Sequence, residues 1–167
     1  KPKLAKESSY VYSRDYHRAV KAGRESEQRW PESAKVLSNL YRSLSKSEDL
    51  ANREEVLALR DKVLTSLGYL QLKMGNNSAA INRFRKVRQT GTQSGKALVG
   101  YGWAAINEAG NTGNYEQALT PWLALQSRSM AESSTHEALL AVPFIYEAVD
   151  LNQNALQAYD LALDKLR

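Results

Sequence analysis

The chain has 167 residues, and 43% of them are hydrophobic, which suits a single domain with a buried core or a piece of a longer repeat array. It contains no Cys, which excludes a disulfide framework, a Cys-ligated zinc site and a thiol nucleophile. The net charge of +5 is uneven: residues 1–46 carry 11 basic and 5 acidic side chains, residues 47–96 carry 9 and 5, and residues 97–167 carry 3 and 8. A basic front and an acidic end could steer a charged partner or let copies associate head to tail.

Ala and Leu are abundant and no run of β-branched residues alternates with polar ones, so the pattern favours an all-α chain. Residues 1–61 are expected to form N-terminal helices that amount to a partial or degenerate repeat. Within them, Trp30-Pro31 marks a helix start, because Pro is tolerated in the first turn. Between Leu50 and Met74 the pattern leaves open whether one long helix or two shorter helices form.

A helix pair is predicted around Gly68 and Ala80. Gly75-Asn76 indicates the turn between its two helices, and small residues at Gly68 and Ala80 would let the helices approach closely. The apolar residues expected to fill the seam between the two helices are Leu64, Leu67, Leu70, Ile81, Phe84 and Val87.

The same pattern recurs twice. Gly102 follows Gly68 after 34 residues, and Pro143 stands at the equivalent position in a third copy. The small residue and the later Ala are 12 residues apart in the first and third copies and 16 in the second, so four extra residues within 107–113 are expected to lengthen the second turn. An Ala with an aromatic residue four positions later marks each second helix, as Ala80/Phe84, Ala118/Trp122 and Ala155/Tyr159.

This pattern resembles the tetratricopeptide repeat (TPR), with its W-x2-L-G-x2-Y and A-x3-F signature. The resemblance implies an all-α, right-handed superhelix of about 7–9 helices in antiparallel pairs. It places one repeat at residues 62–95, a second, with a lengthened turn, at 96–131 and a third at 132–167, in one continuous solenoid. The chain departs from the signature because its first Trp is replaced by Leu64, Leu98 and Leu139.

The resemblance also implies a concave groove lined by the first helix of each repeat. The residue after each small position would point into it, which gives Tyr69, Trp103 and Phe144. We expect a peptide or partner helix there, with apolar anchors and some acidic character, although the aromatic residues could instead be covered by a terminal helix of the chain or by a second subunit. Groove neighbours by helical spacing include Lys62, Lys73, Lys96, Asn107, Glu137, Leu140 and Glu147.

A second hypothesis rests on four basic residues along the second helix of the first repeat. They could contact phosphates or anionic lipid, although a solvated convex face is the simpler interpretation. The surrounding apolar residues are core by spacing, so no platform for base stacking is evident. These basic residues are Arg83, Arg85, Lys86 and Arg88.

Catalytic and metal-binding patterns have little support. His136-Glu137 begins like a zinc-protease helix, but Leu140 stands where the second His is required. We therefore expect a non-enzymatic scaffold or interaction module without metal or cofactor, which binds a protein or peptide. A homo-oligomer and an accessory domain of a larger enzyme or envelope assembly stay open, and nucleic acid is disfavoured. The lack of Cys and the start at Lys1 favour the bacterial periplasm or envelope, with the cytoplasm as the alternative.

Overall fold

The computed structural model describes residues 29–46 and 54–167, apart from the side chain of Asn111. The chain divides into two compact units, residues 1–36 and 37–167, and the candidate site lies in the second. The described residues form helices, turns and loops without a strand, which confirms the all-α prediction for them. One helix covers residues 29–46, close to the predicted start at Trp30. The other helices predicted within residues 1–28 and 47–53 lie outside the described residues.

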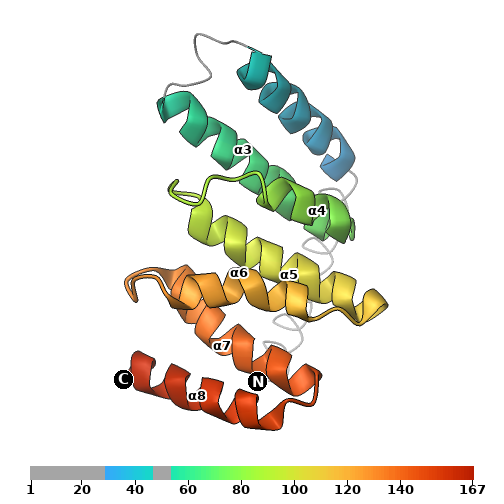
Figure 1. Cartoon of the computed structure of the whole chain (residues 1–167). Helices are drawn as coiled ribbons and strands as arrows, with labels where there is room; N and C mark the ends of the chain where they lie inside the picture. The colour runs from blue at the N-terminus through green and yellow to red at the C-terminus, as the bar shows by residue number, and fades with distance from the viewer. Residues whose placement is uncertain (1–28, 47–53) are drawn as a thin grey trace, which may run out of the picture. The chain divides into compact units, whose positions relative to one another are not determined.

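Six further helices follow in chain order, and each packs against the next. Helices α3, α5 and α7 also contact one another in sequence, so they form one row, against which α4, α6 and α8 pack (Figure 1). None of the described helices is both long and apolar enough to cross a bilayer. The helix bounds are Glu54–Lys73 (α3), Asn77–Phe84 (α4), Ser94–Thr112 (α5), Glu116–Gln126 (α6), Ser133–Ala148 (α7) and Asn152–Leu166 (α8).

The sequence leaves open whether one or two helices form between residues 50 and 74. Over its described part, from Glu54 to Lys73, this segment is one continuous helix, α3. Its first turn carries Glu54 and Glu55, and its last turn carries Lys73. Acidic residues at the N-terminus and a basic residue at the C-terminus both complement the helix dipole. Of the six residues predicted to fill the seam with α4, five are buried and Leu70 is partly buried.

Close packing between the rows depends on glycines that face aromatic rings. A Cβ atom added to Gly68 would lie 2.5 Å from the ring of Phe84, and one added to Gly100 would collide with the same ring. Phe84 therefore fills the space between α3 and α5 that these two glycines leave. Gly102 has the same relationship to Trp122, which is fully buried.

The turns inside the three helix pairs share one backbone position. Gly75, Gly113 and Asp150 all have positive φ angles, of 76°, 73° and 58°. Each lies five residues before the buried Ala of the following helix, which is Ala80, Ala118 or Ala155. The left-handed conformation ends one helix and lets the next begin in the same register each time.

The four extra residues of the second copy do not lengthen its turn, so that prediction is wrong. Helix α5 continues to Thr112, and its left-handed residue follows the small position by 11 residues, compared with seven in the other two pairs. Four residues correspond to about one helical turn. The insertion therefore adds one turn to α5 and returns Gly113 to nearly the same side of the helix.

Candidate partner-binding site

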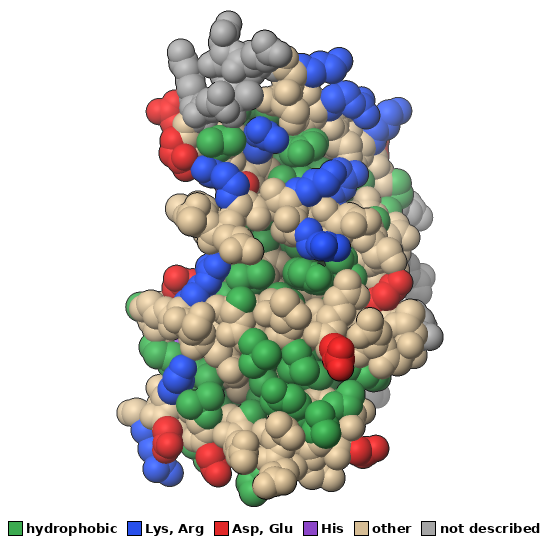
Figure 2. Space-filling model, viewed as in Figure 1, with side chains coloured by type: hydrophobic (Ala, Val, Ile, Leu, Met, Phe, Trp, Pro, Cys, Tyr) green, Lys and Arg blue, Asp and Glu red, His purple; other side chains and the backbone are tan. Residues whose placement is uncertain are grey.

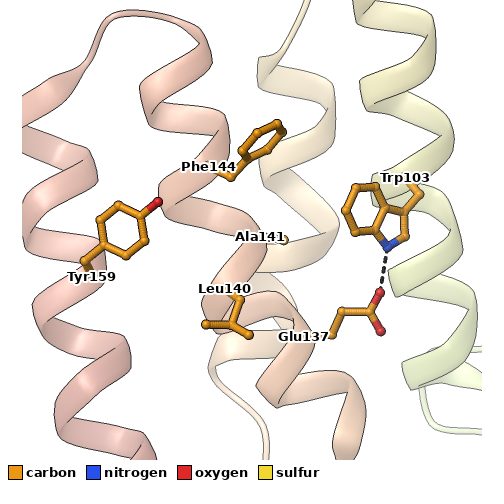
Figure 3. Close-up of a pocket in the computed structure, with 6 residues that line it drawn as sticks. All are labelled: Trp103, Glu137, Leu140, Ala141, Phe144 and Tyr159. Carbon is orange, nitrogen blue, oxygen red and sulfur yellow. Dashed lines mark hydrogen bonds between the residues drawn. The ribbon is translucent and has the colours of Figure 1, made fainter.

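An apolar pocket of about 440 Å³ lies across α7 and is bordered by α5 and α8 (Figure 3). Four of its residues lie within two turns of α7, with successive spacings of three, one and three, and form one stripe along that helix. Trp103 enters from α5 and Tyr159 from α8. The α7 stripe comprises Glu137, Leu140, Ala141 and Phe144.

The large apolar side chains of this pocket are exposed. Leu140 has an exposed fraction of 59% and Phe144 one of 51%, and Trp103 and Tyr159 are each 37% exposed. Their clustering around one cavity differs from the scattered exposed Leu residues of ordinary surfaces. A concave, mostly apolar site with few polar groups is the usual form of a binding pocket.

Trp103 is held on two sides. Its indole Nε1–H donates a hydrogen bond of 2.6 Å to a carboxylate oxygen of Glu137, so the side chain of α5 is tied to α7 (Figure 3). Its ring meets Trp122 edge-on, with 5.1 Å between ring centroids and an interplanar angle of 76°. A charge-assisted hydrogen bond and an edge-to-face aromatic contact together fix the orientation of the ring.

Tyr69, the third aromatic residue predicted for the groove, is partly buried and does not line this pocket. Its ring packs edge-on against Phe84 at 5.1 Å, and its hydroxyl donates to the backbone carbonyl of Lys96 at 2.8 Å. Burial raises the pKa of Tyr69 to about 12, and the negative charge of Glu137 adds to the increase. The structure therefore joins Trp103 with Phe144, whereas Tyr69 mainly connects α3 to α5.

The predicted cationic neighbours are also absent from the pocket. Among the described residues, Glu137 is its only charged lining residue. Desolvation raises the pKa of Tyr159, and the negative charge of the exposed Glu147 adds to the increase. The pocket is thus negative, which disagrees with the expected acidic peptide. The predicted groove residues that lie on the exposed surface outside its lining are Lys62, Lys73, Lys96 and Asn107.

The role of Tyr159 was not recognised from the sequence. Its spacing from Ala155 matched that of two scaffold residues, Phe84 and Trp122, which are buried. Tyr159 lies on α8, the last helix of the chain as given, and no described helix packs beyond it. The Ala-x3-aromatic spacing alone carries no signal that distinguishes it.

No protein-family model matches the chain, and comparisons with curated proteins and with solved structures give no match either. The chemistry of the pocket residues is therefore the basis for a function. Within residues 29–46 and 54–167, no three His, Cys, Asp or Glu side chains gather closely enough to hold a metal ion.

Arg88 has a structural role that separates it from the rest of the predicted basic patch. Its guanidinium donates to Asp61 at 2.8 Å and to both oxygens of Glu54 at 2.9 and 3.0 Å. Hydrogen bonds to Glu54 and then Asp61 raise the pKa of Arg88, and the bond from Arg88 lowers the pKa of Glu54. A Cβ atom at Gly91 would lie 2.6 Å from the Asp61 carboxylate, so the connection after α4 approaches α3 closely.

Arg83 and Lys86 do lie together. They line a hollow of about 330 Å³ with Ala79 and Asn82, whereas Arg85 is exposed and does not line it. Figure 2 shows Lys and Arg side chains gathered around α3 and α4, and hydrophobic side chains gathered over α6 to α8. This distribution follows the charge difference between the two parts of the sequence.

Proposed function

We propose that this chain is a non-enzymatic interaction module, a TPR-like solenoid that binds a segment of a partner protein in the pocket between Trp103 and Tyr159. The observation that carries the proposal is the cluster of four exposed apolar side chains around one cavity. The recurrence of helix pairs with left-handed turns at one register supports the solenoid, because stacked repeats present a continuous face for binding.

The exposed area is sufficient for moderate affinity. Burying a large apolar side chain completely is worth about 1.5–3 kcal/mol, so covering the exposed parts of the pocket residues contributes roughly 1 kcal/mol each. A bound segment adds apolar area of its own and loses conformational freedom. We therefore expect dissociation constants in the micromolar range, about −8 kcal/mol.

Leu140 and Leu156 provide a matched test. Both are exposed leucines, at 59% and 63%, but only Leu140 lines the pocket. Peptides selected from a random display library on the wild-type chain would be measured against Leu140→Ala, Phe144→Ala and Leu156→Ala. We expect roughly tenfold weaker binding for the first two, about 1.4 kcal/mol, and no change for the third. Equal losses for Leu140→Ala and Leu156→Ala, with unchanged helicity, would place the binding site elsewhere.

A second candidate function is favoured by the hollow that Arg83 and Lys86 line with Asn82. Two cations beside an amide suit a phosphate or sulfate group. Binding of the polyanion heparin should weaken steeply with salt and lose part of that slope in Arg83→Gln and Lys86→Gln. Arg88→Gln is unsuitable as a control because it removes the bonds of the guanidinium to Glu54 and Asp61, whereas Lys62→Gln removes an exposed charge outside the hollow. A flat salt titration would eliminate this function.

A further inference from the structure

We infer that the pocket between Trp103 and Tyr159 selects a partner segment in which a cationic group follows an apolar anchor, and that Glu137 is the residue that recognises the cation. This inference rests on the proposed function of the same pocket. It replaces the acidic partner expected from the sequence with one of the opposite charge.

Glu137 carries a negative charge at the edge of the pocket and makes no ion pair among the described residues. Its hydrogen-bond partner, the Trp103 indole, is neutral. The ion pairs given by the described residues join Arg88 to Glu54 and Asp61, and none of them involves Glu137. Of the basic side chains nearest in sequence, Arg128 donates to Gln89 and Ser94 and Lys165 donates to a backbone carbonyl of α6.

The geometry keeps this carboxylate available. One oxygen accepts the indole N–H, which holds the side chain at the pocket edge, while a carboxylate has about four acceptor positions in total. The charge is also felt beyond the pocket, because it contributes to the raised pKa of Tyr69 on α3. A cation at this edge would meet both the carboxylate and the aromatic rings of the pocket, and both attract it.

The spacing of the pocket residues defines the partner further. Leu140 lies three residues from Glu137 and Phe144 lies seven, which along a helix axis correspond to about 4.5 and 10.5 Å. An apolar side chain resting between Leu140 and Phe144 would therefore place a group one helical turn away beside Glu137. A peptide with Leu or Phe and a neighbouring Lys or Arg has this arrangement.

Three small molecules with the same phenyl group test the charge preference: 2-phenylethylammonium, 2-phenylethanol and 3-phenylpropionate. Each would be titrated into the full chain at low salt, with the Trp103 indole N–H resonance followed by NMR and assigned with Trp103→Phe. Trp30, which is outside the pocket lining, provides an internal reference. We expect millimolar binding, with the ammonium compound about threefold to fivefold tighter than the alcohol and the carboxylate weakest.

Glu137→Gln separates charge from shape, because Gln keeps an oxygen that can accept the Trp103 hydrogen bond. It should abolish the preference for the ammonium compound, measured as the ratio of its affinity to that of 2-phenylethanol in the same variant. Glu116→Gln removes the same charge from the exposed start of α6, outside the pocket lining, and should retain the preference.

The outcomes distinguish failure of the pocket as a binding site from failure of Glu137 as the residue that selects a cation. If the alcohol binds and the three compounds have equal affinity, the pocket stands but selection by Glu137 is overturned. Selection is also overturned if Glu137→Gln still prefers the ammonium compound, since the preference then comes from the general field of the acidic end. If none of the compounds perturbs the Trp103 resonance, both the pocket and the selection fail.

Discussion

Arg88 donates a hydrogen bond of 2.8 Å to the carboxylate of Asp61, which is 3% exposed in the middle of α3. The backbone N–H of Arg88 donates to the other oxygen of the same carboxylate at 3.2 Å. Two bonds from one residue therefore hold the connection between α4 and α5 against α3, although the residues are 27 positions apart.

Loss of this link should destabilise the fold. We expect Asp61→Ala to lower the free energy of unfolding by about 3 kcal/mol, because hydrogen bonds to charged groups are worth more than neutral ones. Arg88→Ala should cost more, since it leaves the Asp61 carboxylate buried and unpaired. Urea unfolding monitored by circular dichroism measures both. Arg85→Ala, at a neighbouring exposed position, is the control, and an equal effect of Arg85→Ala and Arg88→Ala would contradict the structural role of Arg88.

Two glycines of α5 should respond to Ala in opposite directions. Gly102→Ala places a methyl group against the Trp122 ring, and such overpacking typically costs about 1–3 kcal/mol. Nothing lies within 4 Å of the Cβ position at Gly110, so Gly110→Ala should gain about 0.5–1 kcal/mol from improved helix propensity. Thermal unfolding of the two variants gives the sign directly. A gain from Gly102→Ala would mean that α5 and α6 are not in the contact described.

The positive φ angle shared by the three turns can be tested where the residue is Gly and where it is Asp. Gly75→Ala forces a Cβ into the left-handed region and should cost about 1 kcal/mol. Asp150→Gly removes such a Cβ and should gain roughly 0.5 kcal/mol, after the added freedom of the unfolded chain is taken into account. Chemical unfolding midpoints report both changes. If Asp150→Gly instead destabilises the fold, interactions of the Asp side chain stabilise it by more than the positive φ angle costs.

Tyr69 should make stability fall at alkaline pH. Its pKa is raised to about 12 in the folded chain from its ordinary value of 10, so the folded state retains the hydroxyl proton more strongly than the unfolded state does. The contribution is complete below pH 10 and is lost as pH rises from about 10 to about 12. Tyr69→Phe should have a shallower decline over this range, measured by urea unfolding at each pH.

Glu137→Gln provides a second check on the same titration. Because the charge of Glu137 adds to the raised pKa of Tyr69, its removal should bring that pKa closer to 10. The near-ultraviolet absorbance of tyrosinate, with Tyr69→Phe subtracted, isolates this one residue. An unchanged titration of Tyr69 in Glu137→Gln would remove the electrostatic link between α3 and α7.

Sequence spacing predicted the faces of the helices better than it predicted their partners. Gly68, Ala80 and Phe84 could be assigned to a packed seam because a small residue and an aromatic one at helical spacing specify complementary surfaces. Arg88 could not be assigned, because its spacing shows which side of the chain it occupies but not that Asp61 lies opposite. Trp103 and Glu137 meet across 34 residues, a contact that depends on how α5 and α7 are placed.

Tyr69 and Tyr159 show that sequence spacing does not predict which aromatic residues are open to a partner. Tyr69 was expected to be open to a partner, yet its hydroxyl is bonded to the backbone at the start of α5. Tyr159 was expected to be part of the scaffold, yet it borders the pocket. The spacing from the Ala to the aromatic residue is the same in every repeat, whereas burial depends on which neighbour covers that repeat.

The extra turn of α5 has a consequence for how such a chain can change in length. A helix that gains or loses four residues keeps its following turn on nearly the same side, while a change of two residues rotates that turn by about half a circle. Viable insertions and deletions between the small residue and the left-handed residue should therefore come in whole helical turns. Related sequences should therefore differ in length at these positions by about four residues at a time, while elsewhere they can differ by single substitutions.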